Sequence, residues 1–353
     1  MDTIQQRTAL PLALRLCAVA LGLTNAACAA SGVAIDAASR NEAVAAAVNQ
    51  LERAYVFPDK AKAIGADLRA RLQRHEFDGL DGDGLAQAMT QAMRDISHDG
   101  HLEVRYQQDV ASPKADAGTT VAEDGERAQQ RRTNYGFSSV GRLKGNLGYI
   151  DVHQFGRPPG AAQRIAAAMA LLTETDALIV DLRQCHGGDP ETVMTFASYL
   201  YDTPTHLNDV YWQDEKRLES RWTQARVDGQ RYGGTRPLYL LTSAETFSGC
   251  EDLAYAMKNN GRAVLVGETT GGGAHAGSPQ RLAAHFMMFV PSGRPINPIT
   301  HDNWEGVGVA PHVAVAADKA LDTAQIAVLT RLAKQERDAI WKEKLEHQIA
   351  ELN

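Results

Sequence analysis

The apolar positions of the chain change their spacing part-way along, and the change divides the sequence into two parts. Between 41 and 94 the apolar residues recur at intervals of three or four, as in Val44, Val48 and Leu51. This period is typical of amphipathic helices that bury one face. The pattern predicts a small helical domain over residues 31–107.

A polar stretch separates the two parts. Residues 108–133 contain several glutamines, charges of both signs and Gly118, and their apolar residues follow no period. Polar segments without periodicity are typical of connecting chain. We therefore expect a linker or an exposed loop here.

The second part alternates short apolar runs with helical stretches. Residues 147–152, 177–182 and 238–241 each have the length and composition of a strand. The run 177–182 has no polar face until Asp181, as a parallel strand buried on both sides requires. Strands that alternate with helices form βαβ units and a parallel sheet covered by helices. We expect an α/β core over residues 134–318.

The end of the chain is charged and helical in its pattern. Residues 319–353 carry an apolar stripe that includes Leu321, Val328 and Leu332. A helix with one apolar stripe buries it against a partner surface. That surface is either the core or a second copy, so a homo-oligomer formed through this helix is one expectation.

The first residues have the pattern of an export signal. In residues 1–30 two arginines flank a short apolar run, 16–23, and small residues follow it. This order is typical of a secretory signal peptide, and the run is too short to span a bilayer. We expect cleavage near Ala29 or Ala30 and a periplasmic or secreted protein. Lipoprotein anchoring at Cys28 is the weaker alternative.

The charge balance narrows the classes of partner. The 353 residues contain 36 Lys and Arg against 43 Asp and Glu, a net charge of −7, and no cluster of basic residues appears. A nucleic-acid-binding surface needs such clusters to meet phosphates. The sequence therefore excludes nucleic acid as the expected partner.

Two of the four cysteines, Cys185 and Cys250, lie outside the predicted signal segment. In an oxidising compartment they could form a disulfide. The sequence supports equally well the alternative that both cysteines are small buried residues with free thiols.

A serine stands where a predicted strand meets a predicted helix. The strand 238–242 leads through Ser243 and Thr246 to Ser248-Gly249, where the helix begins. The positive end of a helix dipole favours a developing alkoxide, and the Gly249 amide could face an oxyanion. The alternative is that Ser248 or Thr246 only caps the helix, which the spacing alone favours. Ser243 ends the strand and is a weaker nucleophile candidate.

A second glycine-containing turn follows the buried strand that ends at Asp181. Gly187 and Gly188 would let backbone amides face a ligand at the carboxyl end of the sheet. Such amides suit an oxyanion hole. A tight turn between strand and helix is the alternative.

A third segment is rich in glycine. Gly271, Gly272 and Gly273 precede His275, and the segment lacks the Lys-Ser/Thr pair of a phosphate-binding loop. We therefore exclude nucleotide binding and expect these four residues to line a substrate cleft.

Histidines supply candidate bases. His98 and His101 lie three residues apart, but no glutamate separates them and no third ligand is close in sequence. We therefore expect no metal and no cofactor. His101 precedes a strand-like run and so has an anchored position. Glu305 lies between Trp304 and a glycine, where a carboxylate could orient a histidine or could remain a solvated loop acid.

These segments follow one another in an order that resembles a known family. They are Asp99-Gly-His101, Gly148-Tyr-Ile-Asp-Val152, Asp181-Leu-Arg with Gly187-Gly188, Thr242-Ser-Ala-Glu-Thr-Phe-Ser248, Gly267 to His275, and Asn303-Trp-Glu-Gly-Val-Gly308. Over about residues 95–315 the chain resembles the serine peptidases of the C-terminal-processing (tail-specific) and tricorn-core family. It is most similar to the branch related to interphotoreceptor retinoid-binding protein.

The resemblance implies a crotonase-like α/β core with a mostly parallel sheet. It implies that Ser248 is the nucleophile and that amides of Gly249, Gly187 and Gly188 form the oxyanion hole. The gap between His101 and the first core strand is too short for the PDZ domain of many relatives, so no PDZ domain is expected.

The sequence departs from the Ser–Lys members of the family. Their catalytic lysine corresponds to Gly273 here. The tricorn-like alternative uses histidine and glutamate, and His101 and Glu305 match those places. The resemblance therefore implies a Ser248–His101–Glu305 triad that cleaves peptide or protein substrates.

The same resemblance supplies a rival function. The retinoid-binding relatives carry a hydrophobic ligand on this scaffold and need no working triad. A non-catalytic protein that binds retinoids or lipids is thus the main alternative. Acyl-CoA chemistry is a third, and it rests on the fold alone.

Overall fold

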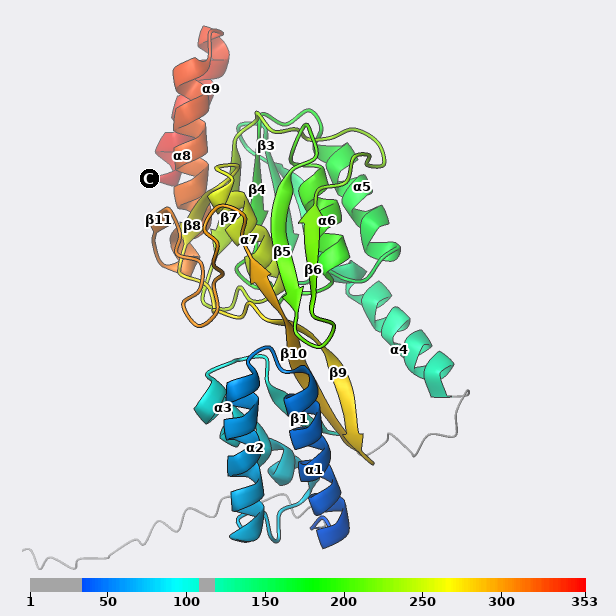
Figure 1. Ribbon diagram of the computed structural model, residues 1–353. Helices are drawn as coiled ribbons and strands as arrows, with labels where there is room; N and C mark the ends of the chain where they lie inside the picture. Colours follow the sequence, from blue (N-terminus) through cyan, green and yellow to red (C-terminus); the bar gives the residue numbers. More distant parts are fainter. Residues whose placement is uncertain (1–33, 108–117) are drawn as a thin grey trace, which may run out of the picture. The chain divides into compact units, whose positions relative to one another are not determined.

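The computed structural model describes residues 34–107 and 118–353, with only the backbone described for 118–124 (Figure 1). The predicted signal segment, with its cleavage site and Cys28, lies outside these residues. So does the first part of the predicted linker, 108–117.

Three helices form the first part of the described chain, as predicted. They are α1 (Ala37–Ala54), α2 (Pro58–Gln73) and α3 (Gly82–Ser97). The Asp36 side chain accepts a 2.8 Å hydrogen bond from the Ser39 amide, and Asp81 caps α3 in the same way. Carboxylates at these positions satisfy amides that have no partner inside the helix.

The core of these helices is completed by strands from much later in the chain. The strands are β1 (Glu103–Tyr106), β9 (Ala276–Ala283) and β10 (Phe286–Ile296), and β10 pairs antiparallel with both others. The buried cluster of the helices includes Leu282, Phe286, Met288 and Val290 from the hairpin. The predicted boundary at 134 therefore does not separate two independent cores.

The far end of β10 belongs to the second part of the chain. There it pairs antiparallel with β5 (His206–Trp212), which pairs with β6 (Arg217–Trp222). One strand thus connects the helical part with the rest of the chain (Figure 1).

The main sheet is mostly parallel, as predicted. Its order is β11-β8-β7-β4-β3-β2, and only β2 runs antiparallel to its neighbour. The strands are β2 (Phe137–Leu143), β3 (Leu147–Val152), β4 (Ala177–Asp181), β7 (Leu238–Thr242), β8 (Val264–Gly267) and β11 (Val313–Ala314).

Helices cover both faces of this sheet. One face packs on α5 (Gly160–Leu172), α6 (Pro190–Ser198) and α7 (Gly249–Asn259). The other face packs on α8 (Ala320–Gln335), against which α9 (Ala339–Leu352) packs. Within β4, Leu178 and Val180 join the first cluster and Ile179 joins the second. This explains why the strand is apolar at every position before Asp181.

The predicted loop over 108–133 is wrong for its second half. Residues Gly118–Arg132 form α4, followed by a short 3-10 turn at Asn134–Gly136. The segment is rich in Ala, Gln, Glu and Arg, which favour helix on intrinsic propensity. It lacks the periodic apolar stripe on which the prediction relied.

The predicted single helix over 319–353 is also wrong, because the chain breaks it in two. Glu336 adopts an extended backbone after α8. The Asp338 side chain then accepts hydrogen bonds from the amides of Ile340 (2.9 Å) and Trp341 (3.3 Å) and begins α9. Helix α8 packs on the sheet and α9 packs on α8, with Val328 and Leu345 buried in one cluster.

No helix in residues 34–107 or 118–353 combines the length and apolar character that a bilayer crossing needs.

The loops that follow β4 and β7 lie at the carboxyl edge of the sheet, where ligands bind in open α/β sheets. A disulfide joins them, between Cys185 in the first loop and Cys250 at the start of α7, with their Cα atoms 6.0 Å apart. Of the two alternatives for these cysteines, the structure has the disulfide.

We expect Phe286→Ala to destabilise the helical part, because Phe286 is only 1% exposed in the core that α1–α3 share with β10. Removing a buried phenyl ring should lower the free energy of unfolding by about 3–5 kcal/mol. Urea denaturation followed by circular dichroism at 222 nm measures this. Leu218→Ala on β6 is the control, since Leu218 is 57% exposed. Equal stability of the two variants would contradict the shared core.

Candidate active site

Ser248 stands on a strained turn between β7 and α7. Its backbone has φ 53° and ψ −122°, a region that non-glycine residues rarely occupy. The turn is held by Thr246, whose hydroxyl donates to the Leu182 carbonyl (2.8 Å) and accepts from the Ser243 amide (3.0 Å). The Ser243 hydroxyl donates to the Arg183 carbonyl. Thr246 and Ser243 thus support the turn that presents Ser248.

Three glycines surround the Ser248 side chain. Gly187 and Gly188 have φ values of 109° and 136°, which L side chains disfavour. A Cβ atom on Gly187 would lie 2.9 Å from the Cβ of Ser248 and 3.3 Å from its Oγ. A Cβ atom on Gly249 would lie 3.3 Å from the Gly188 nitrogen. The predicted oxyanion-hole residues therefore meet at the serine.

Two of these glycine amides are available to a ligand. Within the described part of the chain, neither the Gly188 amide nor the Gly249 amide donates a hydrogen bond. The Gly187 amide, in contrast, donates to the Sγ of Cys250 at 3.0 Å. The pair that could stabilise an oxyanion is therefore Gly188 and Gly249, and Gly187 serves by leaving space.

Ser248 opens into a cavity of about 840 Å³, a volume within the range of ligand-binding clefts. Gly188, Gly249, His101 and His275 also line it. Its apolar wall contains Trp212, Phe247, Met287, Met288, Phe289 and Trp304. The charged residues that line it are Glu103, Arg105, Glu219, Arg221 and Asp252.

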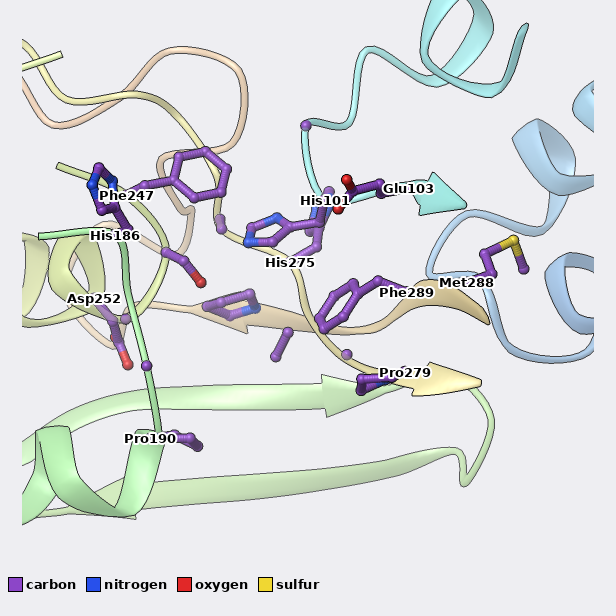
Figure 2. Close-up of a pocket in the computed structure, with 18 of the residues that line it drawn as sticks. His101, Glu103, His186, Pro190, Phe247, Asp252, His275, Pro279, Met288 and Phe289 are labelled. Carbon is purple, nitrogen blue, oxygen red and sulfur yellow. The ribbon is translucent and has the colours of Figure 1, made fainter. Parts of the chain in front are cut away.

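His101 lies between two aromatic rings in this cavity. Figure 2 shows it between Phe247 and Phe289, whose ring centroids are 4.7 and 5.8 Å from that of the imidazole. The side chain is 9% exposed, and neither ring nitrogen has a hydrogen-bond partner among the described residues. Burial lowers the pKa of His101 to about 4, against the opposing charge of Asp99. The imidazole is therefore neutral near pH 7.

Gly273 makes room for His101. A Cβ atom at this position would lie 2.8 Å from the Cε1 of His101 and 2.1 Å from the Cζ of Phe247. No side chain fits there while both rings hold their places. The position that carries lysine in the Ser–Lys peptidases is thus filled by the imidazole and the phenyl ring.

Asp99 is the buried carboxylate beside both histidines. Its Oδ2 lies 2.8 Å from the Nδ1 of His275 and accepts a 3.1 Å hydrogen bond from the Tyr55 hydroxyl. Its Oδ1 accepts from the His101 amide (2.9 Å) and lies 3.7 Å from the Nδ1 of His101. Burial works to raise the pKa of Asp99, but the hydrogen bond and charge of His275 outweigh it and lower the pKa. Sequence reasoning quoted Asp99 only as part of a motif.

Glu305 lies close to His101 without lining the cavity. Its Oε2 accepts hydrogen bonds from the amides of Ala274 (2.6 Å) and His275 (3.2 Å). Its Oε1 is buried and has no partner in the described ranges. Burial, and then the charge of Asp99, raise the pKa of Glu305. Glu305, Asp99 and His101 each bring one polar atom within 4.8 Å of the others.

Of the four residues predicted to line the cleft, His275 lines the cavity together with its neighbour Ala274, whereas Gly271, Gly272 and Gly273 are not among its lining residues. The amides of Gly272 (2.7 Å) and Gly273 (2.9 Å) turn inward and donate to the carboxylate of Glu251.

Glu251 is a supporting residue that sequence reasoning missed. Besides the two glycine amides it accepts hydrogen bonds from the Ser248 amide (2.8 Å) and the Thr270 hydroxyl. It is fully buried, and burial raises its pKa. The Ser248-x-x-Glu251 spacing is that of a capping box and could have indicated it.

Comparison with known proteins identifies the second part of the chain. Residues 146–315 match peptidase family S41. They form an S41 peptidase domain. The chain is 28% identical over 173 residues to carboxyl-terminal-processing peptidase 3, chloroplastic, of Arabidopsis thaliana. The match covers 49% of this chain and 32% of that relative, so this chain spans about a third of its length.

Solved structures share the fold around the S41 domain. A lipoprotein from Streptococcus agalactiae matches with a TM-score of 0.57 at 13% identity, over 83% of this chain and 96% of that one. Mature CPAF matches with 0.56 at 12% identity, over 84% and 99%. The tricorn protease matches with 0.51 at 13% identity, over 86% of this chain and 37% of its own. The chain therefore shares its mixed α/β fold with these structures.

We expect the imidazole of His101 to remain neutral well below the ordinary histidine pKa, because burial between Phe247 and Phe289 penalises the charged form. Proton NMR of the histidine ring signals over pH 3–8 measures the midpoint, and His101→Asn assigns the signal by removing it. A midpoint near 4 is expected. A midpoint near 6.5 would contradict the buried, unpaired imidazole.

Proposed function

We propose that the protein is an exported serine peptidase in which Ser248 attacks the peptide carbonyl on a crotonase-like core. One observation carries this proposal. Ser248 stands at the start of α7 beside two unused amides, Gly188 and Gly249, and shares its cavity with the neutral imidazole of His101. Nucleophile, base and oxyanion donors are the parts that acyl transfer needs. The S41 domain supports the same reaction.

The proposed chemistry follows from these positions. His101 accepts the hydroxyl proton of Ser248 while Oγ bonds to the peptide carbon, and the amides of Gly188 and Gly249 hold the oxyanion. The imidazolium then gives its proton to the amine that leaves. Water attacks the acyl-enzyme with His101 again as base, which frees the acid product and Ser248.

Two carboxylates, those of Asp99 and Glu305, lie close enough to His101 to stabilise its imidazolium form. Asp99 lies 3.7 Å from the Nδ1 of His101, and one carboxylate oxygen of Glu305 lies within 4.8 Å of a ring nitrogen of His101. A carboxylate at Nδ1 holds the productive tautomer and stabilises the positive ring. We therefore extend the Ser248–His101–Glu305 triad by Asp99 as a positioning residue.

The resting site is not fully assembled. Within residues 34–107 and 118–353, no hydrogen bond joins Ser248 to His101, and both ring nitrogens of His101 are buried without a partner. Burying a polar nitrogen in this way costs free energy. Catalytic hydrogen bonds are often long in unliganded sites and tighten with substrate. A bound peptide that shifts His101 toward Ser248 would give these nitrogens their partners.

The disulfide and the predicted signal peptide support a location outside the cytoplasm. The Cys185–Cys250 disulfide supports an oxidising environment, in agreement with the predicted signal peptide. We propose a periplasmic or secreted protein.

Non-catalytic binding of a hydrophobic ligand, such as a retinoid or a lipid, is the second candidate function, because aromatic and methionine side chains form one wall of the cavity. The same wall also suits an apolar side chain of a peptide beside the scissile bond.

We expect a fluorophosphonate probe to label the mature protein at Ser248, and Ser248→Ala to abolish the labelling, because the probe needs an activated hydroxyl. In-gel fluorescence with intact mass spectrometry measures it. Ser139→Ala, an exposed serine of β2, is the control and should label like the unaltered protein. Labelling that survives Ser248→Ala would exclude Ser248. If retinol quenches the tryptophan fluorescence at a one-to-one ratio and the probe labels nothing, the result would favour a non-catalytic protein that binds a hydrophobic ligand.

We expect Gly273→Ala to slow labelling at least tenfold, because the added methyl group would lie 2.1 Å from Phe247 and 2.8 Å from His101 and displace the two rings. Gly141→Ala on β2 is the matched control, since a Cβ there meets nothing within 4 Å. Labelling rates and circular dichroism of both variants measure the effect. A Gly273→Ala protein that folds and labels at the normal rate would show that the space at Gly273 is not needed for the activation of Ser248.

A further inference from the structure

Four buried polar atoms without partners gather beside the proposed catalytic base. They are both ring nitrogens of His101, the Nε2 of His275 and the Oε1 of Glu305, none of which has a hydrogen bond in the described ranges. Each buried polar group of this kind is costly and needs an explanation. Ser248 and His101 line the same cavity, so a bound peptide could reach the imidazole, whereas Glu305 does not line that cavity.

The spacing of these groups is close to that of a metal site. Asp99, His101 and Glu305 each offer one ligand atom, and the three atoms lie within 4.8 Å of one another. The Nδ1 of His101 lies 3.7 Å from the Oδ1 of Asp99. Ligands about 2.0–2.1 Å from a tetrahedral zinc ion lie about 3.4 Å apart. Small side-chain movements would therefore bring the three atoms to coordination distance.

The types of ligand agree with this spacing. An imidazole nitrogen with two carboxylate oxygens suits Zn²⁺. The Nδ1 of His275 already holds the Oδ2 of Asp99, and the amides of Ala274 and His275 hold the Oε2 of Glu305. Such hydrogen bonds orient ligating groups and leave their other oxygens for the ion.

We propose that Asp99, His101 and Glu305 form a zinc-binding site that inhibits the serine chemistry. Zinc takes the lone pair of the Nδ1 of His101, so the ring proton resides on Nε2. That nitrogen then cannot accept the proton of Ser248. The inhibition rests on the proposed function, whereas zinc binding does not.

The site was hidden from sequence reasoning, which considered His98 and His101 as the pair. His98 is exposed at the end of α3 and lies outside the group. The third ligand, Glu305, is about 200 residues away in sequence and reaches His101 only through the fold.

Binding is tested by zinc titration of the tag-free mature protein in competition with a chromophoric zinc chelator. One ion per chain is expected, and Glu305→Gln and Asp99→Asn should each weaken binding at least tenfold. Asp209→Asn is the matched control, because Asp209 also contacts a histidine, His206, at 2.9 Å outside the site. Circular dichroism checks that the variants fold. Absence of saturable binding, or binding that folded Glu305→Gln leaves unchanged, would overturn the site.

Inhibition is tested by the rate of fluorophosphonate labelling. Saturating zinc should slow labelling at least tenfold, and EDTA should restore it. Ser248→Ala should bind zinc like the unaltered protein, which separates the two ideas: a chain that binds zinc but never labels would reject the peptidase and keep the site. Zinc that binds at this site and leaves labelling unchanged would overturn the inhibition.

Discussion

The carboxylate of Glu251 joins the parts on which the site depends. It holds the amide of Ser248 on one side and the amides of Gly272 and Gly273 on the other. These hydrogen bonds hold Gly273 beside His101, so the proposed nucleophile and the proposed base are positioned from one buried group. A carboxylate in the protein interior is stable only with such a set of donors. The strained turn at Ser248 and the space at Gly273 therefore depend on the same hydrogen bonds.

The second constraint on the site is that two positions, Gly187 and Gly273, have no side chain. Gly187 lets the Ser248 side chain approach the loop that carries Gly188, and Gly273 lets His101 and Phe247 occupy the place of a lysine. These two contacts explain why a base other than lysine is possible on an S41 domain. The position that the family resemblance equates with the lysine, Gly273, lies in the glycine-rich loop, whereas His101 comes from the segment between α3 and β1. The helical part of the chain thus contributes directly to the site.

Local patterns were sufficient to predict some of this structure and insufficient for the rest. The strand ending at Asp181 was predictable because both of its faces are buried, and the turn at Ser248 because strand, glycine and helix follow one another in sequence. The pairing of β1 with β10 was not predictable, since it joins residues almost 200 positions apart. The roles of Asp99 and Glu305 depend on the same long-range contacts, and single-sequence periodicity contains no information about them.

The unpaired atoms around His101 connect catalysis with metal binding through one physical requirement. A neutral imidazole has one lone pair and one N–H, so its two nitrogens cannot both act as bases. In the proposed peptidase cycle the lone pair must face Ser248 and the N–H must face Asp99 or Glu305. A zinc ion at the carboxylates requires the opposite tautomer. The carboxylates that we propose to stabilise the imidazolium during proton transfer are therefore the same groups that would attract the ion. Their negative charge would therefore both support proton transfer by His101 and make the site sensitive to inhibition by zinc.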